Sequence, residues 1–238
     1  MALIKTAEEI KILREGGQIL AKVLQKVAEK VAPGVATWDL DQIARKEIKS
    51  FGAEPAFPGY KIALHVPAYP AALCTSINNE VVHGIPKKER LLKEGDIIGL
   101  DLGVRYKGLY TDAAITGAVG KVSAECTALL DATKLALEKG LEEIKPGNTL
   151  GDIAAAISSV AKAGRFGVIR DLGGHGVGHA IHEDPFVPNF GKPGTLETLK
   201  VGMVLAIEPM FTLGDWRVKF LEDGWTVVTA DGSIAAHF

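Results

Sequence analysis

The sequence predicts a mixed α/β domain in which helices cover an antiparallel sheet, and three observations lead to this prediction. Four segments carry apolar side chains at the spacing of an amphipathic helix. Two strand-like runs, 97–106 and 109–116, are joined by Lys107-Gly108, which is typical of a two-residue hairpin turn. A Pro-Gly pattern followed by Asp and an apolar residue occurs twice, 113 residues apart. We therefore expect one domain over 1–238, built from related halves at roughly 1–118 and 119–238 with a site between them.

The first two helices have clear sequence signals. Thr6 and Glu9 have the spacing of a capping box, and Pro33-Gly34 ends the helix that follows. Its apolar positions are Ile10, Leu13, Leu20, Leu24, Val27 and Val31. A second helix begins near Thr37 and ends at Gly52. Its apolar face carries Leu40, Ile43, Ala44 and Ile48, and we expect an ordinary solvated polar face opposite.

The remaining elements follow in order. Residues 53–85 are rich in Pro, Gly and short apolar runs, which predicts loops and short strands. The hairpin at 97–116 comes next, followed by helices at about 125–144 and 150–163. Leu129, Leu130, Leu137 and Leu141 give the first of these two helices its apolar face. Glycine-rich and strand-like segments make up the rest of the chain.

Composition excludes several classes of function. Apolar residues make up 47% and charged residues 24%, as in soluble globular proteins, and the net charge is −2. The one dense basic stretch, Lys87, Lys88 and Arg90, is expected to be a solvated turn, so nucleic-acid binding through bulk charge is not expected. Two cysteines suit a reducing compartment. With no long apolar run or export signal, we expect a cytoplasmic protein without membrane contact.

Two carboxylates interrupt the apolar hairpin. A two-residue turn at 107–108 places Asp112 opposite Gly103 and diagonally from Asp101, so both carboxylates lie on one face of the sheet. Two like charges inside a sheet need positive compensation, which a metal ion can provide. The alternative is that one carboxylate is exposed and the other pairs with Arg105 or Lys107.

Two further segments supply metal-type residues. Residues 173–183 (GGHGVGHAIHE) contain His175, His179 and His182 in a glycine-rich segment with few other side chains. This pattern favours ligand binding, and a flexible turn is the alternative. Glu208 interrupts another apolar run, 204–210 (VLAIEPM). Carboxylates with one imidazole suit Mn, Fe, Co or Zn, and several carboxylates can bridge two ions.

Taken together, these motifs resemble the type I methionine aminopeptidases of metallopeptidase family M24, which have the pita-bread fold. The resemblance covers essentially the whole chain. Besides Asp101 and Asp112, it rests on CTSIN at 74–78, EVVHGIP at 80–86, GHGVG at 174–178, HEDP at 182–185, IEPM at 207–210 and DGWT at 223–226.

The resemblance implies a role for each matching residue. It makes metal ligands of Asp101, Asp112, His175 and Glu208, holding two divalent ions (Co, Mn, Fe or Zn) bridged by a water or hydroxide. His182 and His83 are then catalytic and substrate-binding groups that do not ligate the metals. His182 would contact the scissile carbonyl, and His83 would lie on the nitrogen side of the scissile bond. The methionine pocket is formed by Tyr60, Cys74 and Trp225, and simple packing is the alternative for Tyr60.

The resemblance also implies an activity, and this chain departs from the family pattern at two places. The activity is cotranslational removal of methionine from the N-terminal peptide of nascent proteins near the ribosome, by a cytoplasmic monomer. Ile181 stands where an aromatic is common, and we expect His179 only to fill space. The family's last Glu ligand would follow Phe238, so we expect an incomplete final strand and a missing fifth ligand. An Xaa-Pro dipeptidase and a catalytically impaired pita-bread binding module are the alternatives.

Overall fold

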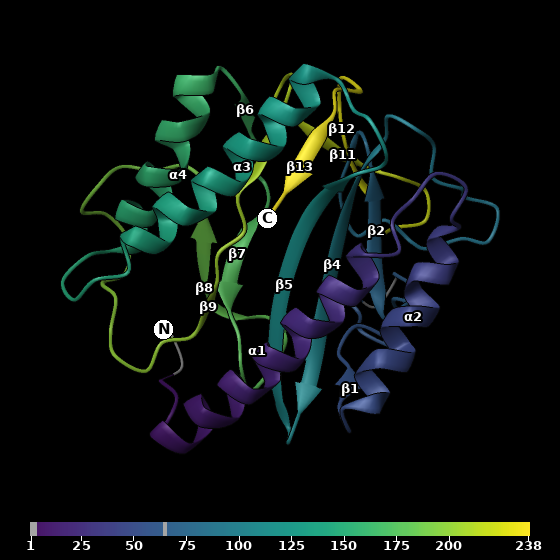
Figure 1. Cartoon of the computed structure of the whole chain (residues 1–238). Coiled ribbons are helices and arrows are strands. Elements are labelled where there is room, and N and C mark those ends of the chain that lie inside the picture. The colour runs from purple at the N-terminus through teal and green to yellow at the C-terminus, as the bar shows by residue number, and fades with distance from the viewer. Residues whose placement is uncertain (1–3, 64–65) are drawn as a thin grey trace.

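A computed structural model describes residues 4–63 and 66–238 of the chain (Figure 1). The helices are α1 (Ala7–Ala28), α2 (Thr37–Ser50), α3 (Ala124–Glu142) and α4 (Leu150–Gly164). The strands of the N-terminal part are β1 (Glu54–Pro55), β2 (Leu73–Ile77), β3 (Glu80–Val82), β4 (Ile97–Tyr106) and β5 (Leu109–Ala118). Those that follow are β6 (Gly167–Val168), β7 (Gly173–Gly176), β8 (Glu183–Pro188), β9 (Leu205–Ala206), β10 (Met210–Thr212), β11 (Val218–Phe220), β12 (Val227–Thr229) and β13 (Ala235–His237).

The long β4–β5 hairpin is the centre of the N-terminal part. Strands β1 and β2 pair with β4, and α1 and α2 pack against this sheet (Figure 1). Successive side chains of β4 alternate between the two faces of the sheet. Those of Ile98, Leu100 and Leu102 face the helices and join the apolar residues of α1 and α2 in one buried core. Asp101 and Gly103 therefore belong to the opposite face, away from the helices.

The C-terminal part has a corresponding layer. Helices α3 and α4 pack on each other and on strands from the sheets β13–β10–β6 and β8–β7–β9. Their core includes Leu129 of α3, Ile153 and Ile157 of α4, and the fully buried Phe211 of β10. A third small sheet, β11–β12–β3, lies where the two parts of the chain meet, because β3 comes from the first and β12 from the second.

Several sequence predictions are confirmed in detail. Thr6 and Glu9 form the capping box of α1. The β4–β5 register pairs Gly103 with Asp112 across a turn in which Lys107 and Gly108 both have positive φ, 48° and 87°. Gly34 and Gly147, the glycines of the repeated Pro-Gly pattern, have φ of 87° and 92° between paired helices. The division into halves at 118 and 119 stays a prediction.

Other predictions need correction. Helix α1 ends at Ala28, so Val31 lies beyond it, and Leu141 is 49% exposed near the end of α3. The polar face of α2 is not ordinary, because Asp41 is fully buried. Its Oδ1 accepts hydrogen bonds from the amides of Ala72 and Leu73, and its Oδ2 lies 2.7 Å from Nε of Arg45. A carboxylate placed in this way stabilises the junction of α2 with β2.

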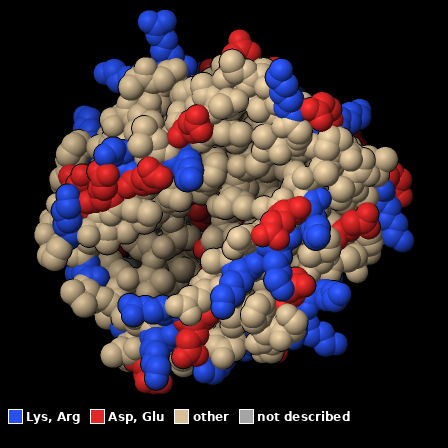
Figure 2. All heavy atoms as spheres, viewed as in Figure 1, with Lys and Arg blue, Asp and Glu red and all other residues tan. Residues whose placement is uncertain are grey.

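The surface agrees with the nearly balanced charge. On the face shown in Figure 2, Lys and Arg side chains lie interspersed with Asp and Glu. Among the residues that the structure describes, no helix has the length and apolar character needed to cross a membrane.

Candidate metal centre and peptide pocket

Asp101 and Asp112 lie on the face of the β4–β5 hairpin opposite the helices. Asp101 pairs in register with Ala114, which makes it the diagonal neighbour of Asp112, as predicted. Burial raises the pKa of Asp101 well above its ordinary value, and the charges of Asp112 and Glu208 raise it further. The alternative partners are engaged elsewhere, because Arg105 pairs with Glu54 and Lys107 with Glu15. The site therefore brings two carboxylates together without a Lys or Arg partner for either among the described residues.

His175 and Glu208 meet this pair from the C-terminal part. His175 lies on β7, and its Nε2 is 3.6 Å from Oδ2 of Asp112 and 3.1 Å from Oε1 of Glu208. Its Nδ1 lies 2.8 Å from the Gly176 carbonyl, which makes that nitrogen a hydrogen-bond donor and leaves Nε2 facing the carboxylates. Glu208 follows β9, and its Oε2 lies 3.1 Å from Nε2 of His237.

The arrangement fits a divalent cation. Asp112 Oδ1 and Glu208 Oε1 are buried and have no hydrogen-bond partner in the described part of the chain, a costly state that a metal ion would relieve. Burial lowers the pKa of His175, but the adjacent carboxylates of Asp112 and Glu208 outweigh it and raise the pKa to about 11. The proton on His175 offsets the negative charge of the carboxylates, and a bound cation would replace it in that role. Oxygen donors with one imidazole nitrogen suit Mn, Fe, Co or Zn.

His182 and His83 lie beside the carboxylates. The ring centroids of His182 and His175 are 4.4 Å apart, and burial lowers the pKa of His182 to about 4. One ligand atom each of Asp112, His175 and His182 lies within 4.8 Å of the others, so distance alone admits His182 as a further ligand. Burial also lowers the pKa of His83 to about 4, and its buried Nδ1 has no partner among the described residues. Both imidazoles are neutral at pH 7 and available to a ligand.

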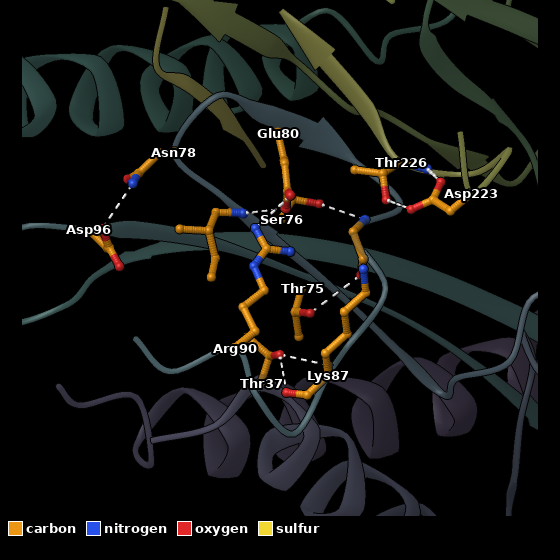
Figure 3. A network of polar contacts seen from close by, with 12 residues as sticks. Thr37, Thr75, Ser76, Asn78, Glu80, Lys87, Arg90, Asp96, Asp223 and Thr226 are labelled. Carbon is orange, nitrogen blue, oxygen red and sulfur yellow. Dashed lines mark hydrogen bonds and ion pairs between the residues drawn. The ribbon is translucent and has the colours of Figure 1, made fainter. Parts of the chain in front are cut away.

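A network of polar contacts supports the turn that carries His83 (Figure 3). His83 is not a glycine, yet its φ is 60°, so the surrounding structure must hold this conformation. Glu80 accepts from the Ile77 amide at 2.9 Å and pairs with Arg90 at 2.5 Å, while the Gly84 amide donates to Ser76 Oγ. The prediction that Arg90 belongs to a solvated turn was therefore wrong, although Lys87 and Lys88 are exposed.

The predicted metal ligands and the predicted pocket residues line one cavity of about 240 Å³. The polar wall is formed by Asp101, Asp112, His175, Glu208, His83 and His182. Tyr60, Cys74 and Trp225 contribute to the apolar wall. The ring centroid of Tyr60 lies 5.0 Å from that of His182 and 6.4 Å from that of Trp225. The structure thus brings all nine sequence-predicted site residues together.

Sequence reasoning missed part of this wall. Phe57 and Tyr69 also line the cavity, and the Tyr69 and Trp225 rings are 5.1 Å apart in a T-shaped arrangement. Both come from the segment predicted only as loops and short strands, where no periodicity distinguishes a wall residue from a loop residue. His237, hydrogen-bonded to Glu208, had no sequence signal beyond its place in an apolar run.

Two residues predicted to have minor roles are also placed. Ile181 is buried with Phe57, Cys74 and Trp225 in one apolar cluster behind the cavity. His179 lies outside the cavity, and its Nε2 is 2.7 Å from Oε1 of Glu9 in α1. The expectation that His179 only fills space was wrong, because it connects its loop to a helix.

Comparisons with known proteins identify the family of this chain. The profile of metallopeptidase family M24 matches residues 11–230. A methionine aminopeptidase of Aquifex aeolicus is 52% identical over 97% of this chain and 90% of its own length. Methionine aminopeptidase 1 of Bacillus subtilis is 45% identical over 100% of this chain and 93% of its own length.

Solved structures lead to the same family. The crystal structure of a methionine aminopeptidase from Thermotoga maritima superposes with a TM-score of 0.95 at 46% identity, covering 100% of this chain and 93% of that one. An Xaa-Pro dipeptidase from Bacillus anthracis gives a TM-score of 0.74 at 23% identity over 58% of its chain, a likeness that concerns the pita-bread fold alone. This chain belongs to metallopeptidase family M24 and, within it, to the methionine aminopeptidases.

Proposed function

We propose that this protein hydrolyses the peptide bond that follows an N-terminal methionine. The observation that carries the proposal is the composition of the single cavity described above, in which a carboxylate–imidazole cluster faces an aromatic and thiol wall. One side has the chemistry of a metal centre, and the other has the apolar lining that a methionine side chain requires. A hydrolytic centre beside an apolar pocket is what an aminopeptidase with this specificity requires.

Asp101, Asp112, His175 and Glu208 are the proposed metal ligands. They supply carboxylate oxygens and one imidazole nitrogen, and the hydrogen bond from His175 Nδ1 to Gly176 fixes the ring for ligation through Nε2. Two divalent ions fit the number of carboxylates. When bound, such ions would activate a water molecule and polarise the scissile carbonyl.

His182 and His83 have proposed roles that do not require ligation. With a pKa of about 4, each imidazole is neutral at pH 7 and can donate one hydrogen bond. We assign His182 to the scissile carbonyl and to the oxyanion that develops from it, because its ring lies against His175. We assign His83 to the nitrogen side of the scissile bond, because its ring packs 5.9 Å from the Trp225 ring of the pocket wall.

The methionine side chain would lie between Tyr60, Cys74 and Trp225. Burial raises the pKa of Cys74 well above its ordinary value, so the thiol is uncharged and acts as part of an apolar surface. A pocket of this kind separates side chains that differ by one methylene group by only about 1–3 kcal/mol. Other unbranched apolar N-terminal residues should therefore be cleaved more slowly rather than excluded.

The substrates that fit this activity are the N-termini of newly made proteins. We accordingly propose that the enzyme works in the cytoplasm close to translating ribosomes and acts as a monomer. The metal in the cell is one of Co, Mn, Fe and Zn, all of which suit these ligands.

Release of methionine from a Met-Ala-Ser peptide tests the proposal. The metal-free protein should be inactive, and Mn(II) or Co(II) should restore methionine release. Asp101→Asn and Glu208→Gln should remain inactive with either metal, whereas Arg105→Gln, which removes a surface pair on the same strand, should behave as the unchanged protein. No release of methionine with any of the four metals would rule the proposed activity out. Full activity after complete metal removal, or in Glu208→Gln, would rule out the assigned metal ligands.

A further inference from the structure

The N-terminal segment packs against the loop that carries His182. The Lys5 amide donates a hydrogen bond to the Gly202 carbonyl at 2.8 Å. The Lys5 side chain passes directly by Gly178, where a Cβ atom would collide with Lys5 Cε. Because Gly178 also has a φ of 145°, both the backbone and the lysine stem require glycine at this position. Lys5 therefore forms part of the support of this loop.

Lys5 ends in a buried ion pair with Glu183. Its Nζ lies 2.5 Å from Oε2 of Glu183, and the two side chains are only 1% and 4% exposed. The partners are 178 residues apart in the sequence. Removing one member of a buried pair leaves a charge without compensation, which costs far more than the loss of a surface pair. Each of the two groups thus fixes the other.

The other carboxylate oxygen of Glu183 organises the turn that precedes His182. Its Oε1 accepts hydrogen bonds from the amides of His179 at 2.5 Å and Ala180 at 2.8 Å. The loop therefore curls around the carboxylate of Glu183, and His182 is the residue immediately before it. Any rotation of the Glu183 side chain would release two backbone amides next to His182.

A second contact joins the same loop to α1. His179 Nε2 lies 2.7 Å from Oε1 of Glu9, but these side chains are 42% and 29% exposed. A pair of this exposure contributes less than the buried one. The Gly178 carbonyl also accepts from the Tyr110 amide at 2.7 Å, which ties the loop to β5, the strand of Asp112.

We propose that Lys5 is a positioning residue for the reaction: by pairing with Glu183 it holds the 179–183 turn, and so places the His182 imidazole over the scissile carbonyl. Lys5 does not line the cavity, so it would act through Glu183 and not by touching the substrate. The inference rests on the role of His182 proposed above. It predicts that a residue before the first helix controls the chemical step.

Lys5→Met tests this inference in the metal-loaded enzyme with Met-Ala-Ser as substrate. The variant keeps the apolar stem and removes the charge. We expect kcat to fall by about tenfold or more, because small displacements of a catalytic group are costly, while KM and the affinity for Mn(II) stay unchanged. Lys5→Arg, which keeps a cation, should recover most of kcat. Lys26→Met is the matched control, because it removes a lysine whose ion pair, with Glu47, joins α1 to α2 at the surface.

Combining the variant with His182→Ala separates positioning from general stability. If Lys5 acts through His182, Lys5→Met should have no further effect on kcat in the His182→Ala background. An equal loss in both backgrounds, or an unchanged kcat in Lys5→Met alone, would overturn the inference. Should Lys5→Met not fold, Glu183→Gln serves the same test, since it keeps an amide acceptor and removes the ion pair. If His182→Ala itself leaves kcat unchanged, the role proposed for His182 fails instead.

Discussion

The Nε2 atom of His175 lies 3.1 Å from Oε1 of Glu208, a buried oxygen that has no hydrogen-bond partner among the described residues. The contact is close, but it lacks the geometry of a hydrogen bond. Asp112 Oδ1 is left in the same state beside it. Atoms of this kind are arranged for a ligand that is neither a side chain nor the backbone.

Metal ions should stabilise the folded protein. Because the folded site binds the cation and the unfolded chain does not, Mn(II) at about a hundred times its Kd should add about 2.7 kcal/mol to the free energy of unfolding. Thermal melts with and without Mn(II) measure this. Asp101→Asn should lose the metal-induced rise, and in EDTA it should be at least as stable as the unchanged protein because one buried like charge is gone.

His83 should make the metal-free protein less stable as the pH falls below neutral. Its pKa is about 4 when folded and 6.5 ordinarily, so between these values the unfolded chain binds the additional proton. The contribution of His83 is therefore present above pH 6.5 and is lost as the pH falls toward 4. Urea melts in EDTA at several pH values should show a shallower decline for His83→Gln. Identical slopes for the two proteins would contradict this assignment.

Tyr60→Leu distinguishes a pocket residue from a packing residue. If Tyr60 contacts the methionine side chain, KM for Met-Ala-Ser should rise by roughly tenfold, since one apolar contact is worth about 1–3 kcal/mol. The melting temperature should change little, because the Tyr60 ring packs at the cavity wall against His182 and Trp225. A lower melting temperature with an unchanged KM would mean that Tyr60 only packs.

Asp41→Ala should destabilise the fold without affecting the site directly. The change leaves two buried backbone amides and Arg45 without their acceptor, and the expected cost is about 3 kcal/mol. Chemical denaturation measures it, with Asp39→Ala on the same helix as the control. A cost below that of Asp39→Ala would show that the buried carboxylate is dispensable.

The hairpin could be predicted from the sequence because its geometry is local. A two-residue turn fixes the register, and the register alone places Asp112 diagonally from Asp101. The helices followed for the same reason, since Thr6, Glu9 and the apolar spacing all lie within a few turns. The convergence of His175 and Glu208 on this pair came from the family resemblance and not from spacing.

The supporting contacts could not be predicted, because their partners are distant in the sequence. Lys5 and Glu183 are 178 residues apart, and either one alone has the pattern of an ordinary surface charge. The sequence around Asp41 predicts a solvated helix face, and only the packing of β2 against α2 shows that this carboxylate is buried. Phe57 and Tyr69 lie in an irregular segment, where only the folded chain shows which aromatic side chains turn toward the cavity.

Anomalous diffraction from crystals grown with Zn(II) tests the metal centre most directly. The account predicts two anomalous peaks at the zinc edge, each about 2.0–2.2 Å from ligand atoms that belong to the set Asp101, Asp112, His175 and Glu208. Zinc bound elsewhere, with these four side chains in contact only with one another and with water, would contradict it.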